Sequence, residues 1–360
     1  MTLYYVATTG SDSNPGTSTL PFASLSKACT MMQSGDEIDV RAGTYVDQST
    51  ANVSGKSNFK IYGTPAGAGN EPNLRYRGGV NFASNAIKVV GSNNFSIEGI
   101  FFSGNNSEIS YSAAKADYDA DPNTFDARYD MNGVVIETSY SATVKSCRVG
   151  GFPGGGIFFK DCDLVTADSN IVRNCTNFSK FGCQGISFLG AVNSPGAVSG
   201  RNGLQALGNT VENCVNQIPW NVTNTVNEGN GIYSDTTKQN LAKTVTYTGK
   251  YLFRGNTVNL CGSAAFHALN SCPGQIDRNF TSGNRRNVEV LNGDIQVNNS
   301  QTVLMYENDF TIANTNRNYI SVLGNSNIAA TAFKFNTVRG TTQAKYQGSL
   351  ITNNSNTFVP

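Results

Sequence analysis

The stretches "GNTVENC" (residues 208–214) and "GNTVNLC" (residues 255–261) are near copies of one heptad. The asparagine near its start recurs, usually with a Val or Phe two residues later, and a looser Val-x-x-Cys pattern accompanies it. The asparagines are Asn170, Asn209, Asn256, Asn279, Asn308 and Asn336, and the cysteines are Cys147, Cys175, Cys214 and Cys261. Self-similarity at intervals of about 20–50 residues indicates a solenoid.

A second series of short apolar segments alternates with the asparagines. These segments are rich in Val, Ile and Phe, are separated by Gly, Asn and Ser, and begin near residues 86, 133, 156, 185, 231, 264, 287, 319 and 349. Segments of this length and composition are typical of short strands and tight turns, and the shortest repeat has no room for a helix. We therefore expect an all-β fold in which parallel strands stack about 4.8 Å apart in a β-helix of about ten coils.

The recurring residues then have structural roles. Asn tolerates the left-handed backbone conformation better than any residue except Gly, so we place each asparagine in a sharp turn, with stacked amides forming a ladder of hydrogen bonds. The four cysteines would form a column of buried thiols that act as small apolar residues. Neighbouring coils are also close enough for a disulfide, so the redox state stays open, whereas no pattern supports a zinc site.

Composition excludes several classes of function. The chain has 360 residues, 37 glycines and 14% charged residues, with a formal net charge of +1. That balance offers no basic patch for nucleic acid, and no apolar segment approaches the ~20 residues that a membrane span needs. The first residues, "MTLYYVATTG", are strand-like and contain no secretory signal. We therefore expect a protein secreted after removal of its signal, or a component of a virion surface.

The N-terminal region carries a family resemblance. The stretches "YYVATTGSDSNPG" (residues 4–16) and "GDEIDVRAGTY" (residues 35–45) resemble the start of right-handed parallel β-helix proteins of the pectate-lyase-like superfamily, which includes extracellular polysaccharide lyases and phage tailspikes. The resemblance implies a capping α-helix at residues 21–32 and a strand at residues 36–45. Phe22, Leu25, Ala28 and Cys29 on one helix face would close the N-terminal end of the solenoid.

We treat residues 1–360 as a single β-helix domain. Residues 1–45 form the N-terminal strand and cap, and residues 46–360 form the coils. The coils carry insertions at residues 105–132, 191–203, 216–230 and 237–249. Insertions are where solenoids build their sites, and these four border the same strands. We expect them to wall a groove about four coils long that suits a polysaccharide.

The outward positions of the second series supply the candidate site. In a segment such as "GIFFKD" (residues 156–161), alternate side chains point inward and outward. The candidate catalytic residues are Lys160, Tyr233, Asp235 and Glu137, and the candidate substrate-binding residues are Phe158, Trp220, Phe266, Glu289 and Arg201. Aromatic side chains stack on the apolar faces of sugars, and Lys, Arg or Tyr is the base that the resemblance implies for a lyase. A solvated strand exterior is the alternative for each single residue.

Two other features bear on the chemistry. "DYDADPN" (residues 117–123) places a carboxylate or amide at every second residue, so Asp117, Asp119 and Asp121, with Asp161, are candidate ligands for Ca²⁺, while a solvated acidic loop is the alternative. The single histidine, His267, falls at an inward position of "AAFHAL" (residues 264–269), which predicts a core histidine. A catalytic His267 would require the register to shift by one residue.

The sequence favours a carbohydrate-active protein on an acidic polysaccharide, more readily a lyase than a glycoside hydrolase. The diagnostic motifs of mannuronan epimerases, polygalacturonases and pectate lyases are absent from the sequence. The alternative is a non-catalytic solenoid that only binds glycan, such as a phage tail component or an adhesin. We expect polysaccharide as the partner, neither nucleic acid nor membrane, and a monomer or homotrimer.

Overall fold

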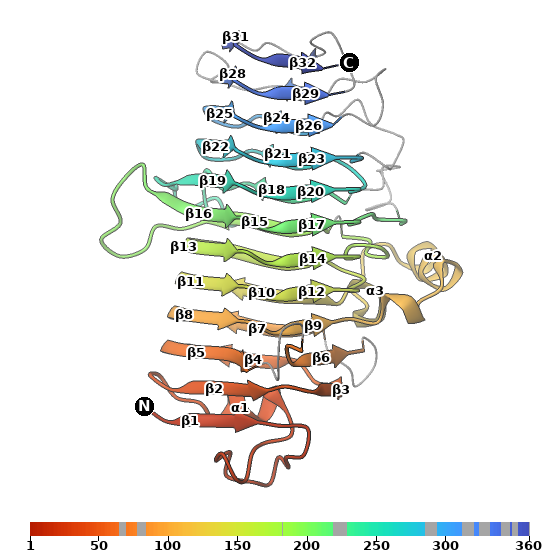
Figure 1. The fold of residues 1–360 in the computed structure, drawn as a ribbon, viewed down its shortest axis with the longest axis vertical. Helices are drawn as coiled ribbons and strands as arrows, with labels where there is room; N and C mark the ends of the chain where they lie inside the picture. Colours follow the sequence, from red (N-terminus) through yellow and green to blue (C-terminus); the bar gives the residue numbers. More distant parts are fainter. Residues whose placement is uncertain are drawn as a thin grey trace.

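The computed structural model is a parallel β-helix that stacks along one axis from the N-terminus to the C-terminus (Figure 1). It describes residues 1–64, 70–77, 84–181, 183–218, 229–284, 294–311, 320–323, 332–339, 346–347 and 352–359. Each full coil contributes one strand to each of three parallel sheets, in the order C, A, B. Sheet B has 11 strands among these residues, close to the ten coils expected, and the right-handed β-helix is confirmed.

The three sheets take their strands at regular intervals along the chain. Sheet C contains β4 (Ala51–Ser54), β7 (Asn85–Val90), β10 (Asn132–Glu137), the first part of β13 (Ile157–Asp168), β15 (Ile186–Ala191), β18 (Ile232–Asp235), β21 (Phe266–Leu269), β24 (Ile295–Asn298), β27 (Ile320–Leu323) and β30 (Tyr346–Gln347). Sheet A contains β1 (Leu3–Val6), β2 (Glu37–Arg41), β5 (Ser57–Thr64), β8 (Asn93–Glu98), β11 (Tyr140–Lys145), the rest of β13, β16 (Asn202–Leu207), β19 (Lys250–Arg254), β22 (Gly274–Asp277), β25 (Val303–Tyr306), β28 (Ala332–Lys334) and β31 (Thr352–Asn354). Sheet B contains β3 (Thr44–Gln48), β6 (Asn73–Tyr76), β9 (Phe101–Ser103), β12 (Arg148–Gly150), β14 (Ile171–Arg173), β17 (Thr210–Glu212), β20 (Thr257–Asn259), β23 (Phe280–Ser282), β26 (Asp309–Thr311), β29 (Thr337–Arg339) and β32 (Thr357–Val359).

Helix α1 (Leu25–Met31) caps the N-terminal end, as the resemblance implied. Ser24 is its N-cap and accepts a hydrogen bond from the Lys27 amide, which satisfies one of the free amides of the first turn. Its buried face, together with Phe22, joins the main hydrophobic core. The expected strand at residues 36–45 is instead two strands, β2 and β3, because the chain turns at Ala42 and Gly43 from sheet A into sheet B.

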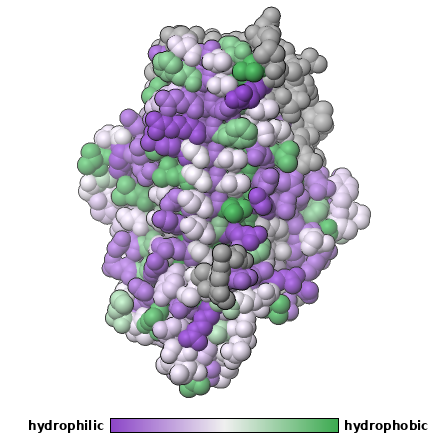
Figure 2. All heavy atoms as spheres, in the orientation of Figure 1, coloured by the Kyte–Doolittle hydropathy of each residue, from purple (hydrophilic) through white to green (hydrophobic). Residues whose placement is uncertain are grey.

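The interior is a continuous apolar column built from the inward positions of all three sheets. Phe159, Phe188, Phe253 and Phe266 form its aromatic centre, with ring centroids 5.1 Å apart for Phe159 and Phe188, and 5.7 Å for Phe188 and Phe253. Each fully buried Phe contributes about 1.5–3 kcal/mol of transfer free energy. The face in Figure 2 is mostly hydrophilic, with scattered hydrophobic residues.

The predicted asparagine ladder is present at the corner between sheets A and B, which we call the A–B corner. Asn170, Asn209, Asn256, Asn279, Asn308 and Asn336 are buried, and each receives hydrogen bonds through its Oδ1 from the preceding rung. Asn356 extends the series. The ladder asparagines are not the left-handed residues that we expected. The residue before each one has the positive φ: Ser169, Gly208, Gly255, Arg278, Glu307, Phe335 and Ser355.

The cysteine column is shorter than expected. Cys175, Cys214 and Cys261 follow β14, β17 and β20 at the same point of successive coils. Cys147 instead precedes β12, where its amide donates to Asn170 Oδ1, so it begins the asparagine ladder and the Val-x-x-Cys match at Cys147 is accidental. All eight cysteines are buried and free.

The insertions project from the two sides of sheet C where its strands begin and end (Figure 1). On one side, between sheets B and C, residues 105–132 form the 3₁₀ helix η1 (Asn106–Glu108) and helices α2 (Tyr111–Ala120) and α3 (Ala127–Asp130). On the other side, at the corner between sheets C and A, the long loops after β15 and β18 lie together. There Gln239 pairs with Thr246, and Asn193 Nδ2 donates to the Thr246 carbonyl. No helix of the described residues is long and apolar enough to cross a membrane.

Candidate functional site

The strand register decides which side chains face outward on sheet C. Ile232 pairs with Phe266, and Tyr233 pairs with His267. Ile232 and Phe266 both lie in the main core, so Tyr233 and His267 both point out of the sheet. The expectation that Phe266 contacts substrate and that His267 is a core residue was wrong, because the register is shifted by one residue and exchanges the two faces.

A charged cluster lies on β7, β10 and β13. Lys88 Nζ is 3.0 Å from Glu137 Oε2, and Lys160 Nζ is 3.3 Å from Glu137 Oε1. Partial burial opposes ionisation of Glu137, but the hydrogen bond from Lys88 and the charge of Lys160 hold its pKa below the usual range. Lys160 also lies 5.9 Å from the ring centroid of Phe158, which is itself buried against Val135 and Cys183. Lys160, Glu137 and Phe158 therefore meet, as the sequence predicted them to lie on one face.

A second pair of candidate residues meets on β18. Tyr233 Oη donates to Asp235 Oδ2 at 3.2 Å, and Thr236 Oγ1 donates to Asp235 Oδ1 at 2.9 Å. Burial nevertheless raises the pKa of the Asp235 carboxyl above its usual value. Glu137 and Asp235 occupy the same outward column three strands apart, about 14 Å by strand spacing, so they do not form a carboxylate pair.

His267 belongs to this second cluster. Its ring lies 4.9 Å from that of Tyr233 between centroids, and its Nε2 is 3.4 Å from Asn298 Nδ2 on β24. Burial lowers the pKa of His267 to about 3, so the imidazole is neutral at physiological pH. A neutral imidazole accepts a proton at one ring nitrogen and donates from the other.

Buried polar atoms without partners gather along the same strip. Among the described residues, Ser187 Oγ, His267 Nδ1, Gln296 Nε2 and Asn298 Oδ1 have no hydrogen-bond partner. They face outward on β15, β21 and β24, next to Tyr233 and Asp235. A buried polar group without a partner costs about 1–3 kcal/mol, so such a strip is suited to a ligand that supplies hydroxyls and a carboxylate. We call Ser187, Tyr233, Asp235, His267, Gln296 and Asn298 the sheet C strip.

The candidate calcium ligands are dispersed. Asp117 and Asp119 lie on α2 rather than in a loop, and successive alternate residues of a helix point in different directions. Asp117 pairs with Lys180 at 2.7 Å, Asp119 with Lys115, and Asp121 accepts from the Asn123 amide. The described residues contain no group of three His, Cys, Asp or Glu side chains that could hold a metal ion. The residues expected to bind calcium are thus not brought together, and calcium binding stays a prediction.

Asp161 and Arg201 are both engaged in local contacts. Asp161 Oδ1 accepts from the Leu241 amide at 2.6 Å, and burial raises its pKa, with a further contribution from Glu137. Arg201 Nε donates to the buried Asp163 at 3.1 Å. Arg201 thus holds the corner between sheets C and A instead of facing the sheet C strip. Trp220 and Glu289 lie outside the described residues.

A family model described as "Protein of unknown function (DUF1565)" matches residues 8–257. The chain belongs to this family. No curated protein sequence matches the chain. The DUF1565 match ends at Thr257, the first residue of β20, so it covers the cap, both groups of insertions and three of the six residues of the sheet C strip.

Solved structures similar to this DUF1565 protein share its fold. A protein described as a glycoside hydrolase matches with a TM-score of 0.57 at 8% identity, over 99% of this chain and 96% of the other. The GH136 lacto-N-biosidase of Eubacterium ramulus matches with a TM-score of 0.52 at 13% identity, over 99% and 67%. The tailspike of E. coli bacteriophage HK620, in complex with a pentasaccharide, matches with a TM-score of 0.51 at 14% identity, over 99% and 58%. At these identities the likeness establishes the β-helix fold.

Proposed function

We propose that the protein is a polysaccharide lyase that binds a uronate-containing chain across the sheet C strip. The observation that carries this proposal is the row of unpartnered buried polar atoms at Ser187, His267, Gln296 and Asn298, beside the Tyr233–Asp235 pair. The β-helix fold shared with a glycoside hydrolase and with a tailspike that binds a pentasaccharide supports a glycan as the ligand. Lys160 remains paired with Glu137, so we assign it to binding an acidic sugar rather than to taking a proton.

The proposed reaction is a β-elimination. The neutral His267 accepts the proton beside the uronate carboxylate, the adjacent carbon–carbon double bond forms, and the glycosidic carbon–oxygen bond breaks. Tyr233 Oη donates its proton to the leaving oxygen, and the amides of Gln296 and Asn298 hold the carboxylate. A bound carboxylate next to the imidazole raises the proton affinity of His267, which matches the base to this step only when substrate is present.

The test is to incubate the protein with a panel of uronate polysaccharides and follow the ultraviolet absorbance of the unsaturated product. Tyr233→Phe and His267→Gln should each lower kcat by about 10²-fold or more, as loss of a general acid or base does. Lys160→Met should mainly raise KM. Tyr306→Phe, on the outside of sheet A, is the matched control and should leave the rate unchanged. An active wild type whose rate survives both Tyr233→Phe and His267→Gln would refute these assignments.

A hydrolase is the second candidate because two carboxyls on this face have raised pKa values. Asp161 follows the outward position of β13, and Asp235 lies two strands further along, about 10 Å by strand spacing. Burial raises the pKa of both carboxyls. Release of reducing ends without an unsaturated product, lost in Asp161→Asn and Asp235→Asn, would support this candidate over the lyase. Binding without either product would support the non-catalytic alternative.

Location and assembly belong to the same proposal. Polysaccharides of this class lie outside cells, so we place the protein in the extracellular space or on a virion surface. Light scattering distinguishes the two proposed assemblies, a monomer of 38.4 kDa and a homotrimer.

A further inference from the structure

A second hollow surface lies on sheet B. It contains none of the residues of the sheet C strip. A cavity of about 690 Å³ lies over β9, β12 and β14 and reaches Asn213, which directly follows β17. A neighbouring cavity of about 510 Å³ shares Phe101 and Arg148 with it and extends over β3 and β6. Together they form a groove that crosses five strands and reaches the coil of β17, about 24 Å long by strand spacing. We call it the sheet B groove.

The floor of the groove combines an aromatic ring with planar polar groups. The Arg148 guanidinium lies 4.6 Å from the ring centroid of Phe101, and its Nη1 donates to Glu71 at 2.6 Å. Arg173, one strand further along, pairs with Glu212 at 2.8 Å. Both arginines are thus neutralised by carboxylates, so the groove is polar without a strong net charge.

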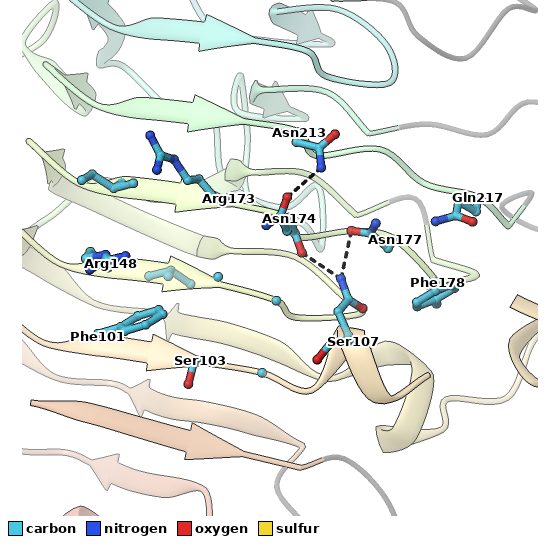
Figure 3. Close-up of a pocket in the computed structure, with 16 residues that line it drawn as sticks. Phe101, Ser103, Ser107, Arg148, Arg173, Asn174, Asn177, Phe178, Asn213 and Gln217 are labelled. Carbon is cyan, nitrogen blue, oxygen red and sulfur yellow. Dashed lines mark hydrogen bonds between the residues drawn. The ribbon is translucent and has the colours of Figure 1, made fainter. Parts of the chain in front are cut away.

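One wall of the groove is formed by the start of the insertion at residues 105–132 (Figure 3). Asn106 Nδ2 donates to the Asn174 carbonyl at 2.8 Å and to Asn177 Oδ1 at 2.9 Å. These bonds attach the insertion to the segment that directly follows β14. Behind this wall, Phe178 packs with Ala114 of α2 and Ile218. The wall is therefore fixed before any ligand arrives, which lowers the entropic cost of binding.

The side chains that face this groove suit one class of ligand. Amide and hydroxyl side chains form part of the lining, from Ser103, Ser107, Asn106, Asn174, Asn177 and Asn213. Planar amides and guanidinium groups bind pairs of neighbouring hydroxyls, and an aromatic ring packs against the apolar face of a sugar. The strands beneath are fully paired with their neighbours, so an extended peptide has no sheet edge to join.

We propose that the sheet B groove is a second, non-catalytic glycan site, which holds an extended oligosaccharide along the axis of the β-helix. It lies on a different sheet from the sheet C strip, and it does not depend on the cleavage proposed there. A chain held in the groove keeps the protein on its polymer between encounters at the strip. Two sites on one rigid body raise the effective concentration of the second site once the first is occupied.

The outward columns of sheet B supply matched controls. Phe101 and Phe280 occupy the same outward column, on β9 and β23, and Arg173 and Arg339 occupy the other, on β14 and β29. Phe280 is 41% exposed and lies outside the groove, and Arg339 pairs with Asp309 much as Arg173 pairs with Glu212. Each control thus removes the same side chain from the same kind of position.

The experiment measures binding of the full chain to a panel of hexasaccharides of neutral hexoses, N-acetylhexosamines and uronates by calorimetry. For a hexasaccharide bound in the groove, Phe101→Ala and Arg173→Ala should each raise Kd about 10-fold or more. Phe280→Ala, Arg339→Ala and Tyr233→Phe should leave Kd unchanged. Arg173 is about half exposed, so its variant tests the groove even where Phe101→Ala destabilises the fold.

Three outcomes would overturn the proposal. In the first, the wild type binds no hexasaccharide. In the second, the groove variants and their controls lose binding equally. In the third, only Tyr233→Phe and other variants of the sheet C strip lose binding. If the wild type binds a hexasaccharide in the groove but cleaves no polysaccharide, the result counts against the proposed lyase alone, so the failures of the two proposals are distinguishable.

Discussion

The A–B corner and the corner between sheets C and A each lead the chain from one sheet into the next, but they are stabilised by different means. At the A–B corner, one short turn repeats, and each rung carries a single buried asparagine that bonds to the next rung. At the corner between sheets C and A, two long loops converge on one buried carboxylate. Asp163 accepts from Ser194 Nα at 2.8 Å, from Tyr247 Oη at 2.8 Å and from Arg201 Nε at 3.1 Å.

The difference separates two ways of stabilising a corner. In the ladder, the stabilisation is distributed over many equal contacts, so the loss of one rung is local. At Asp163, it is concentrated in one charge, which several donors must satisfy at the same time. The stability of the two long loops thus depends on Asp163 alone, whereas the stability of the short turns is spread over all the asparagines of the ladder.

The largest effect is expected for Asp163→Ala, which tests whether the corner between sheets C and A depends on this one carboxylate. The substitution leaves Arg201, which is 11% exposed, without its counter-charge, and it removes the acceptor of Ser194 and Tyr247. Breaking a buried ion pair by removing one partner costs about 3–5 kcal/mol. Urea unfolding should show a loss of this size, and protease should cut the loops of residues 192–201 and 236–249 first. Asp168→Ala is the control; Asp168 is a partly exposed partner of Lys145, and its loss should cost under about 1 kcal/mol.

A second prediction contrasts Asp163 with Asp130, the buried carboxylate of the other insertion. Burial raises the pKa of Asp130 to about 6, despite hydrogen bonds from the Asp126 amide, Ser179 and Lys180. Its folded pKa therefore exceeds its ordinary value of 3.8, so its contribution to stability is complete below pH 3.8 and is lost as pH rises through 6. The loss is about 3 kcal/mol.

Asp163 acts in the opposite direction. Burial opposes its ionisation, but the hydrogen bonds from Arg201, Ser194 and Tyr247 prevail and hold its pKa below the usual range. Its stabilisation is present above the ordinary pKa and is lost as pH falls through the folded value. Urea midpoints measured from pH 4 to pH 7 should show that Asp130→Asn gains relative to wild type as pH rises, while exposed Asp119→Asn does not. A flat difference for Asp130→Asn would contradict the assignment.

The ladder itself should respond more weakly. Asn256→Ala removes the acceptor for the Asn209 amide and side chain, and the donor to the Ala206 carbonyl. Leaving these buried groups unpaired costs about 1–3 kcal/mol, below the effect at Asp163. Asn213→Ala would be confounded by its positive φ of 54°, so Asn259→Ala, on the outer face of β20, is the better control. A cost at Asn256 equal to that at Asp163 would remove the distinction between the two corners.

The smallest effect is expected on the outside of sheet B. Arg339 and Asp309 form an exposed pair at 2.7 Å. Exposed pairs of this kind contribute about 0–1 kcal/mol, so Arg339→Ala should hardly shift the urea midpoint. The same measurement qualifies Arg339→Ala as the control for the sheet B groove, and a loss above about 1 kcal/mol would disqualify it.

The fold could be predicted from the sequence because an asparagine and a short apolar segment recur from coil to coil. The asparagines at 170, 209 and 256 and the apolar segments between them predicted parallel strands and about ten coils, close to the 11 strands of sheet B among the described residues. The conformation at each turn was assigned to the wrong residue. The residue before each asparagine takes the positive φ, because the asparagine side chain must turn inward to accept from the neighbouring backbone.

The site was predictable only in part. Lys160, Glu137, Tyr233 and Asp235 follow regular strand alternation and were placed on the correct face. His267 was missed because "AAFHAL" offers two registers, and the choice put a small Ala265 opposite Ile232 where the large Phe266 belongs. The larger size of Phe266 compared with Ala265 was the signal that could have placed Phe266 in the core and His267 on the outer face. The sheet B groove was missed because Phe101 and Arg148 come together only through stacking of coils.

The buried thiols have a consequence for when and where this chain can mature. Burial raises the pKa of Cys29, Cys162 and Cys272 to about 12, and only the thiolate enters disulfide exchange. The fold contains no cross-link among its eight cysteines, so it requires neither an oxidant nor an isomerase to be complete. Because these thiols are buried, the folded chain keeps the same covalent structure in reducing and in oxidising surroundings.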